Sequence, residues 1–244
     1  MQYTDNSCLF AVMSTAEFRE RKEEFAYKKE MLHSLGSIRY CKAELFKECI
    51  LGTIRLPQKN EQKKAQLSFG FYLTGRKVFF VEDEGKMKAW IEKQTEMFQE
   101  VDTPKQLLLR IMEHMIEEDT LYFSHMESEL DKLEEKISGG TGSNNNFFTS
   151  LIKHRQKLSE FNIYYEQLID IAELFSTCDF YQSEQDTQGW DRFMHRVEQL
   201  QNHVHLLREN VLQIRELYQS MQDAHQNKIM AVITIVTTIF LPLT

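Results

Sequence analysis

Apolar residues recur at alternating intervals of three and four positions towards the C-terminal end of the chain. The series comprises Val197, Leu200, Val204, Leu207, Val211, Ile214, Tyr218 and Met221. This is the spacing of a and d positions over three and a half heptads, and it predicts one long helix with an apolar stripe. The stripe packs either against helices of the same chain or against the same helix of another subunit, and the pattern leaves both alternatives open.

Two further helices are predicted before this one. Thr103 suits the N-cap and Pro104 the first position of a helix that should run to about Ile137. A stretch rich in glycine and asparagine, residues 139–146, then interrupts the pattern. With His154 counted, the next helix has its inward side at Leu151, Leu158, Phe161, Tyr165, Leu168, Ala172 and Phe175. Two antiparallel helices joined by a short loop are the simplest arrangement, with a second break over Cys178–Gly189.

The first hundred residues show shorter segments of both kinds. We expect a helix over residues 15–33, strands over Cys49–Leu56, Leu67–Leu73 and Lys77–Glu82, and a helix over Met87–Phe98. The last two strands are joined at Thr74–Arg76 by a turn typical of a hairpin. These segments predict a small α/β domain.

Together the elements predict an α+β fold that is dominated by helices. We expect an N-terminal α/β domain over residues 1–102, an acidic helical hairpin over 103–180, a stalk helix over 181–228, and the start of a transmembrane helix over 229–244. Only 9 glycines and 3 prolines are present, which favours long helices over an all-β design.

The charge pattern narrows the choice of partners. The formal net charge is −8 and there is no basic stripe, which argues against nucleic-acid binding. Residues 96–136 hold 12 acidic and 4 basic side chains, so this run is either a solvated helix face or a surface that concentrates cations. The cysteines Cys8, Cys41, Cys49 and Cys178 show no CxxC spacing and no signal-peptide pattern precedes them, so we expect reduced cytosolic thiols.

Motifs of catalytic sites are absent from the sequence. It contains no GxSxG, HExxH, Walker or GxGxxG motif. His203 and His205 are two positions apart, which places them about 200° apart around a helix, so they cannot share a metal ion. We therefore expect no enzymatic activity; an enzyme built on the α/β domain is the weakest alternative.

The final run, Ile229–Thr244, has no charges and is mostly apolar. It contains 16 residues, whereas a helix that crosses a bilayer needs about 20. The run follows directly on the heptad-patterned helix, so one continuous rod would lead from water to a membrane. The sequence thus indicates the first part of a membrane span that would continue after Thr244.

The join between rod and membrane segment carries the most specific motif. It reads Asn227-Lys228-Ile229-Met230, followed by Ile233-Thr234-Ile235 and by Ile239–Thr244. These residues resemble the start of the first transmembrane helix of the CorA family of divalent-cation channels. In that family the helix continues past a Pro-Leu-Thr, like Pro242–Thr244 here, to a Gly-Met-Asn signature. The order of an α/β domain, two hairpin helices and one long stalk is similar as well.

The resemblance implies a homopentameric channel in the cell membrane, with this portion on the cytoplasmic side. It implies Mg²⁺ as the transported or regulatory ion, with Co²⁺, Ni²⁺ and Zn²⁺ as alternatives, and pore helices gated by the stalk bundle. The leading alternative is a tail-anchored coiled-coil scaffold without transport activity.

The terminal residues also form a stripe of their own. Asn227, Met230, Thr234, Thr237, Leu241 and Thr244 follow the same alternation of three and four. In a pore-lining helix this stripe would face the ion, and amide and hydroxyl groups suit an ion that keeps its water shell. Met230 and Leu241, with Ile233 beside the stripe, would close such a path by dewetting. The alternative is that the polar residues only pack helix against helix in lipid.

An ion sensor on the stalk is implied by the resemblance alone. In the family, carboxylates of neighbouring subunits share divalent ions near the membrane-distal end of the stalk. Counting back from Asn227 places Arg192 and His195 at the expected acidic positions. Asp191 and Glu198 are the nearest acids and the candidate metal ligands; a register slip of one residue would let Asp191 serve, and otherwise this chain senses ions differently.

Overall fold

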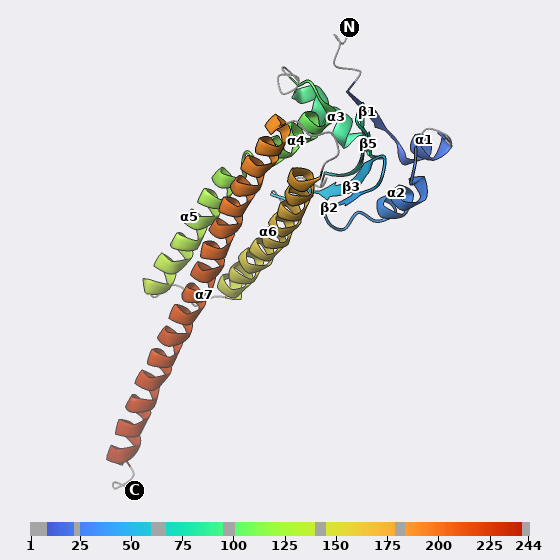
Figure 1. Cartoon of the computed structure of the whole chain (residues 1–244). Coiled ribbons are helices and arrows are strands. Elements are labelled where there is room, and N and C mark those ends of the chain that lie inside the picture. Colours follow the sequence, from blue (N-terminus) through green and yellow to red (C-terminus); the bar gives the residue numbers. More distant parts are fainter. Residues whose placement is uncertain are drawn as a thin grey trace. The chain divides into compact units, whose positions relative to one another are not determined.

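The computed structural model describes residues 9–21, 25–59, 67–94, 101–139, 145–178 and 184–240. In chain order the elements are β1 (Phe10–Met13), α1 (Thr15–Glu20), α2 (Lys28–Leu35), β2 (Lys42–Leu45), β3 (Ile50–Arg55), β4 (Ser68–Leu73), β5 (Val78–Val81), α3 (Lys86–Lys93), α4 (Pro104–Met115), α5 (Asp119–Ser138), α6 (Asn145–Thr177) and α7 (Glu184–Phe240) (Figure 1). Two compact units are formed, Met1–Tyr122 with Glu160–Asn202, and Phe123–Ser159 with His203–Thr244. The predicted helix-dominated α+β fold is confirmed, while the division into four domains stays a prediction.

The first unit is built on a five-stranded sheet with the strand order β1-β5-β4-β3-β2. β1 runs parallel to β5, whereas the other neighbouring strands are antiparallel. β4 and β5 form the predicted hairpin, and Thr74 closes its turn by donating its backbone N–H to the carbonyl oxygen of Lys77 at 2.9 Å. The sheet thus contains three strands that the sequence predicts, β3, β4 and β5. The two edge strands, β1 and β2, are not predicted.

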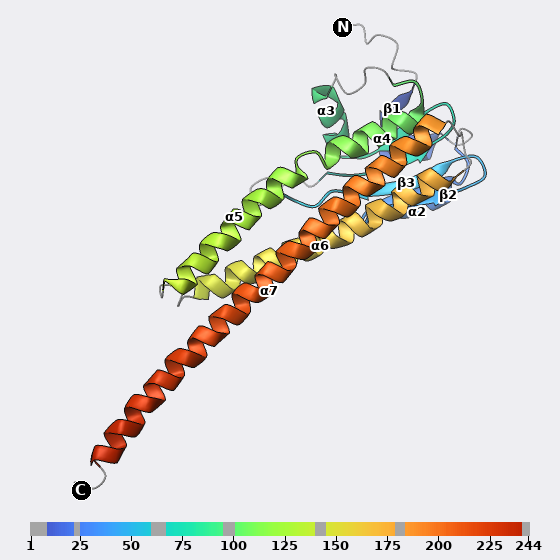
Figure 2. The same ribbon diagram turned by 60° about the vertical axis from the view of Figure 1, so that its left-hand side comes forward.

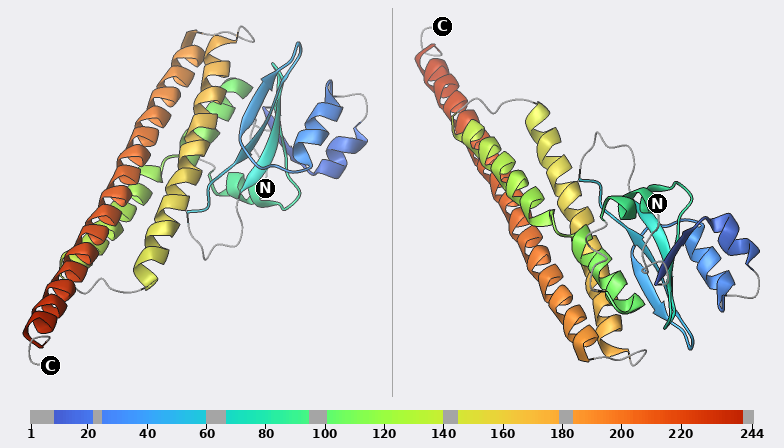
Figure 3. Two further views of the ribbon diagram at one scale, coloured as in Figure 1. Left: turned by 90° about the horizontal axis from the view of Figure 1, so that it is seen from below. Right: turned by 90° about the horizontal axis from the view of Figure 1, so that it is seen from above.

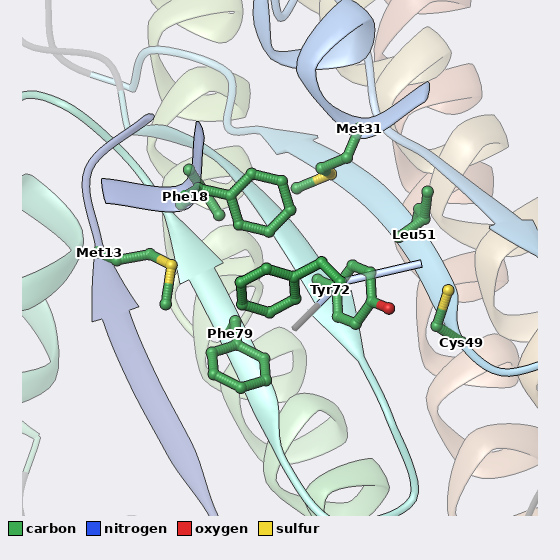
Figure 4. Packing of buried hydrophobic residues seen from close by; sticks show 9 residues of the cluster. Met13, Phe18, Met31, Cys49, Leu51, Tyr72 and Phe79 are labelled. Carbon is green, nitrogen blue, oxygen red and sulfur yellow. The ribbon is translucent and has the colours of Figure 1, made fainter. Parts of the chain in front are cut away.

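Both faces of the central strands are buried. On one face, Phe25 meets the rings of Tyr72 and Phe79 edge-on, at centroid distances of 5.0 and 4.9 Å. This core cluster comprises Met13, Phe18, Phe25, Met31, Cys49, Leu51, Tyr72, Phe79 and Val81 (Figure 4). On the other face, the ring centroid of Phe71 lies 6.4 Å from that of Phe175 on α6. Figure 3 shows α1 and α2 on one side of the sheet and α6 on the other. Burial on both faces explains why β4 and β5 read as continuous apolar runs.

The single helix expected over residues 15–33 is wrong, because the segment contains two shorter helices. α1 starts at a capping box in which Ser14 Oγ accepts the N–H of Glu17 at 3.2 Å and the Glu17 carboxylate accepts the N–H of Ser14 at 2.8 Å. α2 begins only after Tyr27, whose φ of 56° is incompatible with a continuous right-handed helix. Strands β1 and β2 were missed because four residues are too few for an alternating pattern to stand out.

The start of α4 follows the prediction. Thr103 Oγ1 accepts the N–H of Gln106 at 3.1 Å, and Pro104 is the first helical residue. The expected single helix to Ile137 is wrong, however, because α4 ends at Met115 and α5 starts at Asp119. α3 likewise ends at Lys93, and the expected end at Phe98 lies outside the described residues.

Asp119 explains why a new helix starts where it does. Its side chain is only 1% exposed, and its Oδ2 accepts the hydroxyl hydrogen of Tyr165 at 2.7 Å. Its Oδ1 lies 2.5 Å from Nζ of Lys59. A carboxylate in the first turn of a helix is stabilised by the helix dipole. Asp119 therefore both starts α5 and ties that start to α6 within the first unit.

α7 starts within the break expected over Cys178–Gly189, which places Gly189 inside the helix. A Cβ at Gly189 would come within 2.7 Å of Cδ2 of Leu109, so this glycine permits close packing of α7 on α4. The next residue, Trp190, is fully buried and stacks on Phe175 with a centroid distance of 4.3 Å. The expected end of the break at Gly189 is therefore wrong, because close helix packing and not a turn accounts for this glycine.

The second unit consists of the adjoining parts of α5, α6 and α7. Phe147 of α6 stacks on Tyr218 of α7 with 4.9 Å between the ring centroids. The ring centroids of Phe123 on α5 and His203 on α7 are 5.7 Å apart. The buried apolar side chains include Phe123, Met126, Leu130, Ile137, Phe147, Leu151, Leu158, Val204, Leu207, Val211 and Ile214. The predicted stripe is thus buried within one chain from Val204 to Ile214, which supports the intrachain alternative for this part. Figure 2 shows that α7 continues without a break.

We expect Gly52→Ala to destabilise the first unit by about 3 kcal/mol, because the new methyl group would overpack the sheet. Its Cβ would clash with the ring of Phe71 and lie 2.5 Å from the carbonyl oxygen of Lys42, which is backbone and cannot move aside. Urea unfolding measures the loss. Gly36→Ala is the control: its φ is −59° and the nearest atom would be 3.4 Å away, so a change of less than about 1 kcal/mol is expected. Equal losses in the two variants would contradict this packing.

A second prediction concerns pH. Burial raises the pKa of Asp119 above its ordinary value of 3.8, and this outweighs the opposing effects of Lys59 and Tyr165. The folded chain therefore holds this proton more tightly than the unfolded chain. The resulting stabilisation is fully present below the ordinary pKa and is lost as the pH rises through the raised pKa of the folded state. Relative to Asp119→Asn, the wild-type free energy of unfolding should thus fall as the pH rises from about 4. Denaturant unfolding of both proteins at several pH values measures this difference, and a rise would contradict it.

Candidate functional site

The C-terminal part of α7 carries the predicted ion pathway. Every side chain from Asp223 to Ile239 is exposed. The large apolar ones expose between 46% and 65% of their surface: Ile229, Met230, Val232, Ile233, Ile235, Val236 and Ile239. At 100° per residue they spread over about 220° of the helix circumference. An apolar surface over more than half of a helix is typical of a segment that lies against lipid or other helices. The single chain leaves this segment uncovered.

The predicted stripe lies along one side of this segment. At 100° per residue, Asn227, Met230, Thr234 and Thr237 fall within an arc of about 80°, and Ile233 lies beside it. The structure therefore brings these five residues onto one exposed face of α7. The other two predicted pathway residues, Leu241 and Thr244, lie outside the described residues.

The threonine hydroxyls of the stripe have one defined orientation. Oγ1 of Thr234 donates to the carbonyl oxygen of Met230 at 2.8 Å, and Oγ1 of Thr237 donates to that of Ile233 at 3.0 Å. A hydroxyl has one hydrogen and two lone pairs. Because the hydrogen is used within the helix, each hydroxyl can only accept hydrogen bonds from its outward side. Water molecules that bind a cation turn their hydrogens away from the ion, so such a surface suits a hydrated cation.

The two candidate sensor acids also lie on α7, within the first unit. Asp191 and Glu198 are seven residues apart, which places them on the same side of the helix but about 10 Å apart along its axis. Mg²⁺ binds oxygen at about 2.1 Å, so a single ion cannot bind both side chains of one chain. Oε2 of Glu198 lies 3.0 Å from Nδ1 of His195, an interaction that a metal would have to replace.

In the part of the chain that the structure describes, titratable groups elsewhere form no preformed metal site. Within the described ranges, no three His, Cys, Asp or Glu side chains are grouped so that they could hold a metal ion. Cys41, Cys49 and Cys178 are buried and free, in line with the expected reduced thiols, and Cys8 lies outside the described residues. Burial raises the pKa of the Cys41 thiol to about 12, and Arg55 offsets this only in part. Cys41 is therefore a neutral thiol rather than a nucleophile.

Two of the polar contacts that the sequence did not predict involve charged side chains of the helices. One is the buried group of Asp119, Lys59 and Tyr165 in the first unit. The other joins Glu129 of α5 to His154 of α6 in the second unit, with 3.2 Å between Oε2 and Nε2. Each contact joins residues on separate elements, so local sequence patterns do not reveal it. The sequence did hold one sign of the helix start at Asp119, because this residue follows two other acids and acids are favoured in the first turn of a helix.

Within the described part of the chain, no helix is both long enough and apolar enough to cross a bilayer.

Solved structures of other proteins share this fold. The full-length CmaX protein aligns with a TM-score of 0.79 at 16% identity, over 96% of this chain and 74% of that one. The complete CorA magnesium transporter from Methanocaldococcus jannaschii also gives 0.79 at 16% identity, over 98% and 78%. The ZntB cytoplasmic domain from Vibrio parahaemolyticus gives 0.68 at 10% identity, over 88% of each chain. At these identities the likeness establishes the fold alone.

A family model provides the assignment. The model described as "CorA-like Mg2+ transporter protein" matches residues 29–244, and no curated protein matches the sequence. The fold and this match define a member of a class of divalent-cation transporters. The chain belongs to the CorA-like Mg²⁺ transporter family, and the resemblance expected from the motif around Asn227 is confirmed.

Proposed function

We propose that this chain is the cytosolic regulatory portion of a homopentameric Mg²⁺ channel in the cell membrane, together with the first part of its pore-lining helix. Family membership supports the coarser statement, a divalent-cation transporter. The observation that carries the finer proposal is the stripe of Asn227, Met230, Thr234 and Thr237, which is exposed on α7 and presents outward hydrogen-bond acceptors.

The chemistry of the stripe suits Mg²⁺ because this ion gives up its water shell reluctantly. A carboxylate cage would hold such an ion too tightly for passage, whereas neutral acceptors can hydrogen-bond to its water molecules and release them. The amide oxygen of Asn227 and the hydroxyl oxygens of Thr234 and Thr237 are acceptors of this kind. Co²⁺, Ni²⁺ and Zn²⁺ are the alternative ions, and the stripe does not discriminate among them.

The apolar members of the stripe provide the closing element. Met230 is 65% exposed and Ile233 56% exposed in the single chain. Five copies of α7 around an axis would turn each of these residues into a ring. A narrow apolar ring excludes water and thereby blocks a hydrated ion. A small widening of the bundle would admit water again, so movement of the stalk would gate the path.

The stalk acids provide the regulatory element. Each chain has a net charge of −8, so an assembly of five concentrates negative charge, and divalent ions between subunits would relieve the repulsion. Asp191 and Glu198 are too far apart to hold one ion within a chain, which supports a site shared with another subunit. Loss of the ions would restore the repulsion and loosen the bundle. No observation favours the alternative of a tail-anchored scaffold without transport.

Thr234→Val should lower Mg²⁺ uptake at least about fivefold, because it removes one acceptor worth about 1 kcal/mol from each subunit and keeps the side-chain shape. The measurement is dye-reported Mg²⁺ uptake into liposomes that contain the product of the complete gene. Val236→Thr is the matched control: it adds the same hydroxyl on the opposite side of the helix, about 200° away, and should leave uptake close to the wild-type rate. Absence of uptake by the wild-type protein would favour the scaffold. Equal effects of the two variants would place the pathway elsewhere.

The sensor is tested separately, by the solution mass of the 244-residue chain with and without Mg²⁺. We expect millimolar Mg²⁺ to raise the mass of the wild-type chain above that of a monomer. The double variant Asp191→Asn, Glu198→Gln should stay at its Mg²⁺-free mass. Asp170→Asn with Glu173→Gln removes the same two charges from exposed positions on α6, and it should behave as wild type. Identical masses of the wild-type chain under both conditions would count against metal-linked assembly.

A further inference from the structure

The stripe on α7 continues one helical turn before Asn227, to a residue that the sequence pattern alone did not single out. Asp223 lies four residues before Asn227 and seven before Met230, so the alternation of three and four is kept. At 100° per residue, Asp223 falls in the middle of the arc that the stripe occupies. Its side chain is exposed in the single chain. A carboxylate therefore stands on the same exposed face, about 6 Å along the helix axis before Asn227.

Within α7, which the structure describes from Glu184 to Phe240, no base lies beside this carboxylate. Side chains three and four residues apart are neighbours on a helix. For Asp223 these neighbours are all uncharged: Gln219, Ser220, Gln226 and Asn227. Lys228 is five residues away and points about 140° to the side, and His225 is two residues away and points about 200° around the helix. The charge of Asp223 is thus not neutralised by its own helix.

We propose that Asp223 is the charge-selecting residue at the entrance of the ion path. Five copies would form a ring of carboxylates one helical turn before the ring of Asn227, and this ring would draw divalent cations to the path in preference to monovalent ions. The ligand is a hydrated dication, whose water molecules donate hydrogen bonds to the carboxylate oxygens. The inference rests on the proposed function, because the ring exists only in the assembly.

Charge gives this ring a preference that the neutral part of the stripe lacks. The Coulomb energy is proportional to the charge of the ion, so a dication is attracted twice as strongly as a monovalent ion at the same distance. The amide of Asn227 and the hydroxyl of Thr234 carry no net charge, and they accept hydrogen bonds from the water of either kind of ion. Asp223 would therefore select by charge before the neutral acceptors receive the hydrated ion.

Distance separates Asp223 from the other acids of α7. At physiological ionic strength the Debye length is about 8 Å, and charges of exposed groups further apart are largely screened. Asp223 lies about 6 Å before Asn227, within this length, whereas Glu216 lies roughly 16 Å before it. The remaining acids of α7 are at least about 27 Å away along the axis. Asp223 is thus the acid of α7 whose charge reaches the start of the stripe.

The ring would attract the ion without trapping it. Each chain contributes one carboxylate, and the neighbouring stripe residues Ser220 and Asn227 add only neutral groups. Mg²⁺ gives up its water shell reluctantly, so at an exposed entrance it would contact the carboxylates through its own water molecules. Such contacts are made and broken without removing a water molecule from the ion. The carboxylate therefore raises the local concentration of the ion and leaves its passage to the neutral acceptors.

The test is the Mg²⁺ current through the product of the complete gene in a planar bilayer, with K⁺ as background salt and Mg²⁺ added to one side at a time. For entry from the stalk side, Asp223→Asn should raise the half-saturating Mg²⁺ concentration about tenfold, the lower end of the effect of a charged cleft on local ion concentration. Entry from the opposite side should change much less, because the ion then meets the ring only as it leaves. At about 1 M salt the Debye length is about 3 Å, so the difference from wild type should largely disappear.

Two further variants control for the substitution itself. Asp223→Glu keeps the charge and should behave as wild type. Asp223→Asn combined with His225→Asp restores the net charge about 200° around the helix, and it should stay as impaired as Asp223→Asn. A wild-type current with an unchanged half-saturating concentration in Asp223→Asn would overturn this role and leave the channel standing. Equal changes for entry from both sides would overturn it as well, since a distorted helix would act in both directions. Absence of any wild-type current would overturn the channel and this role together.

Discussion

Burial of the apolar stripe of α7 is the interaction on which the rest of the structure depends. In the first unit this helix contributes Trp190, which stacks on Phe175, and in the second it contributes the run from Val204 to Ile214. Each unit therefore holds its own part of the helix through close packing with the same chain. Beyond Met221 this support ends, although the helix continues to Phe240. The exposed segment is thus held at its base by a well-packed rod and is free to contact other surroundings.

The parts of the fold that depend on local spacing could be predicted from the sequence. The α7 stripe, the cap at Thr103 and the hairpin between β4 and β5 each arise from residues close together in the chain, so periodicity and turn chemistry reveal them. The same holds for the stripe from Asn227 to Thr237, because its arrangement follows from helix geometry alone. The proposal that it lines an ion path could not be read from spacing and rests on the family resemblance.

The parts that could not be predicted depend on contacts between distant residues. The break before Asp119 is set by Tyr165 and Lys59, and the helical position of Gly189 is set by Leu109. No local pattern distinguishes a glycine that ends a helix from one that allows another helix to approach. For the same reason, His154 counted only as one more position in an apolar series. The carboxylate opposite it became visible only when α5 and α6 were placed side by side.

The direction of the threonine hydroxyls has a consequence for protons. A chain of hydroxyl groups can relay a proton only if each member can donate to the next. Thr234 and Thr237 have committed their hydrogens to carbonyl oxygens of their own helix. In a path lined by these residues, the threonine hydroxyls would only accept hydrogen bonds from water. They could not donate a hydrogen to the next water molecule. Such a conduit would be open to whole hydrated ions while its threonines take no part in a proton leak, which matters in any membrane that stores energy as a proton gradient.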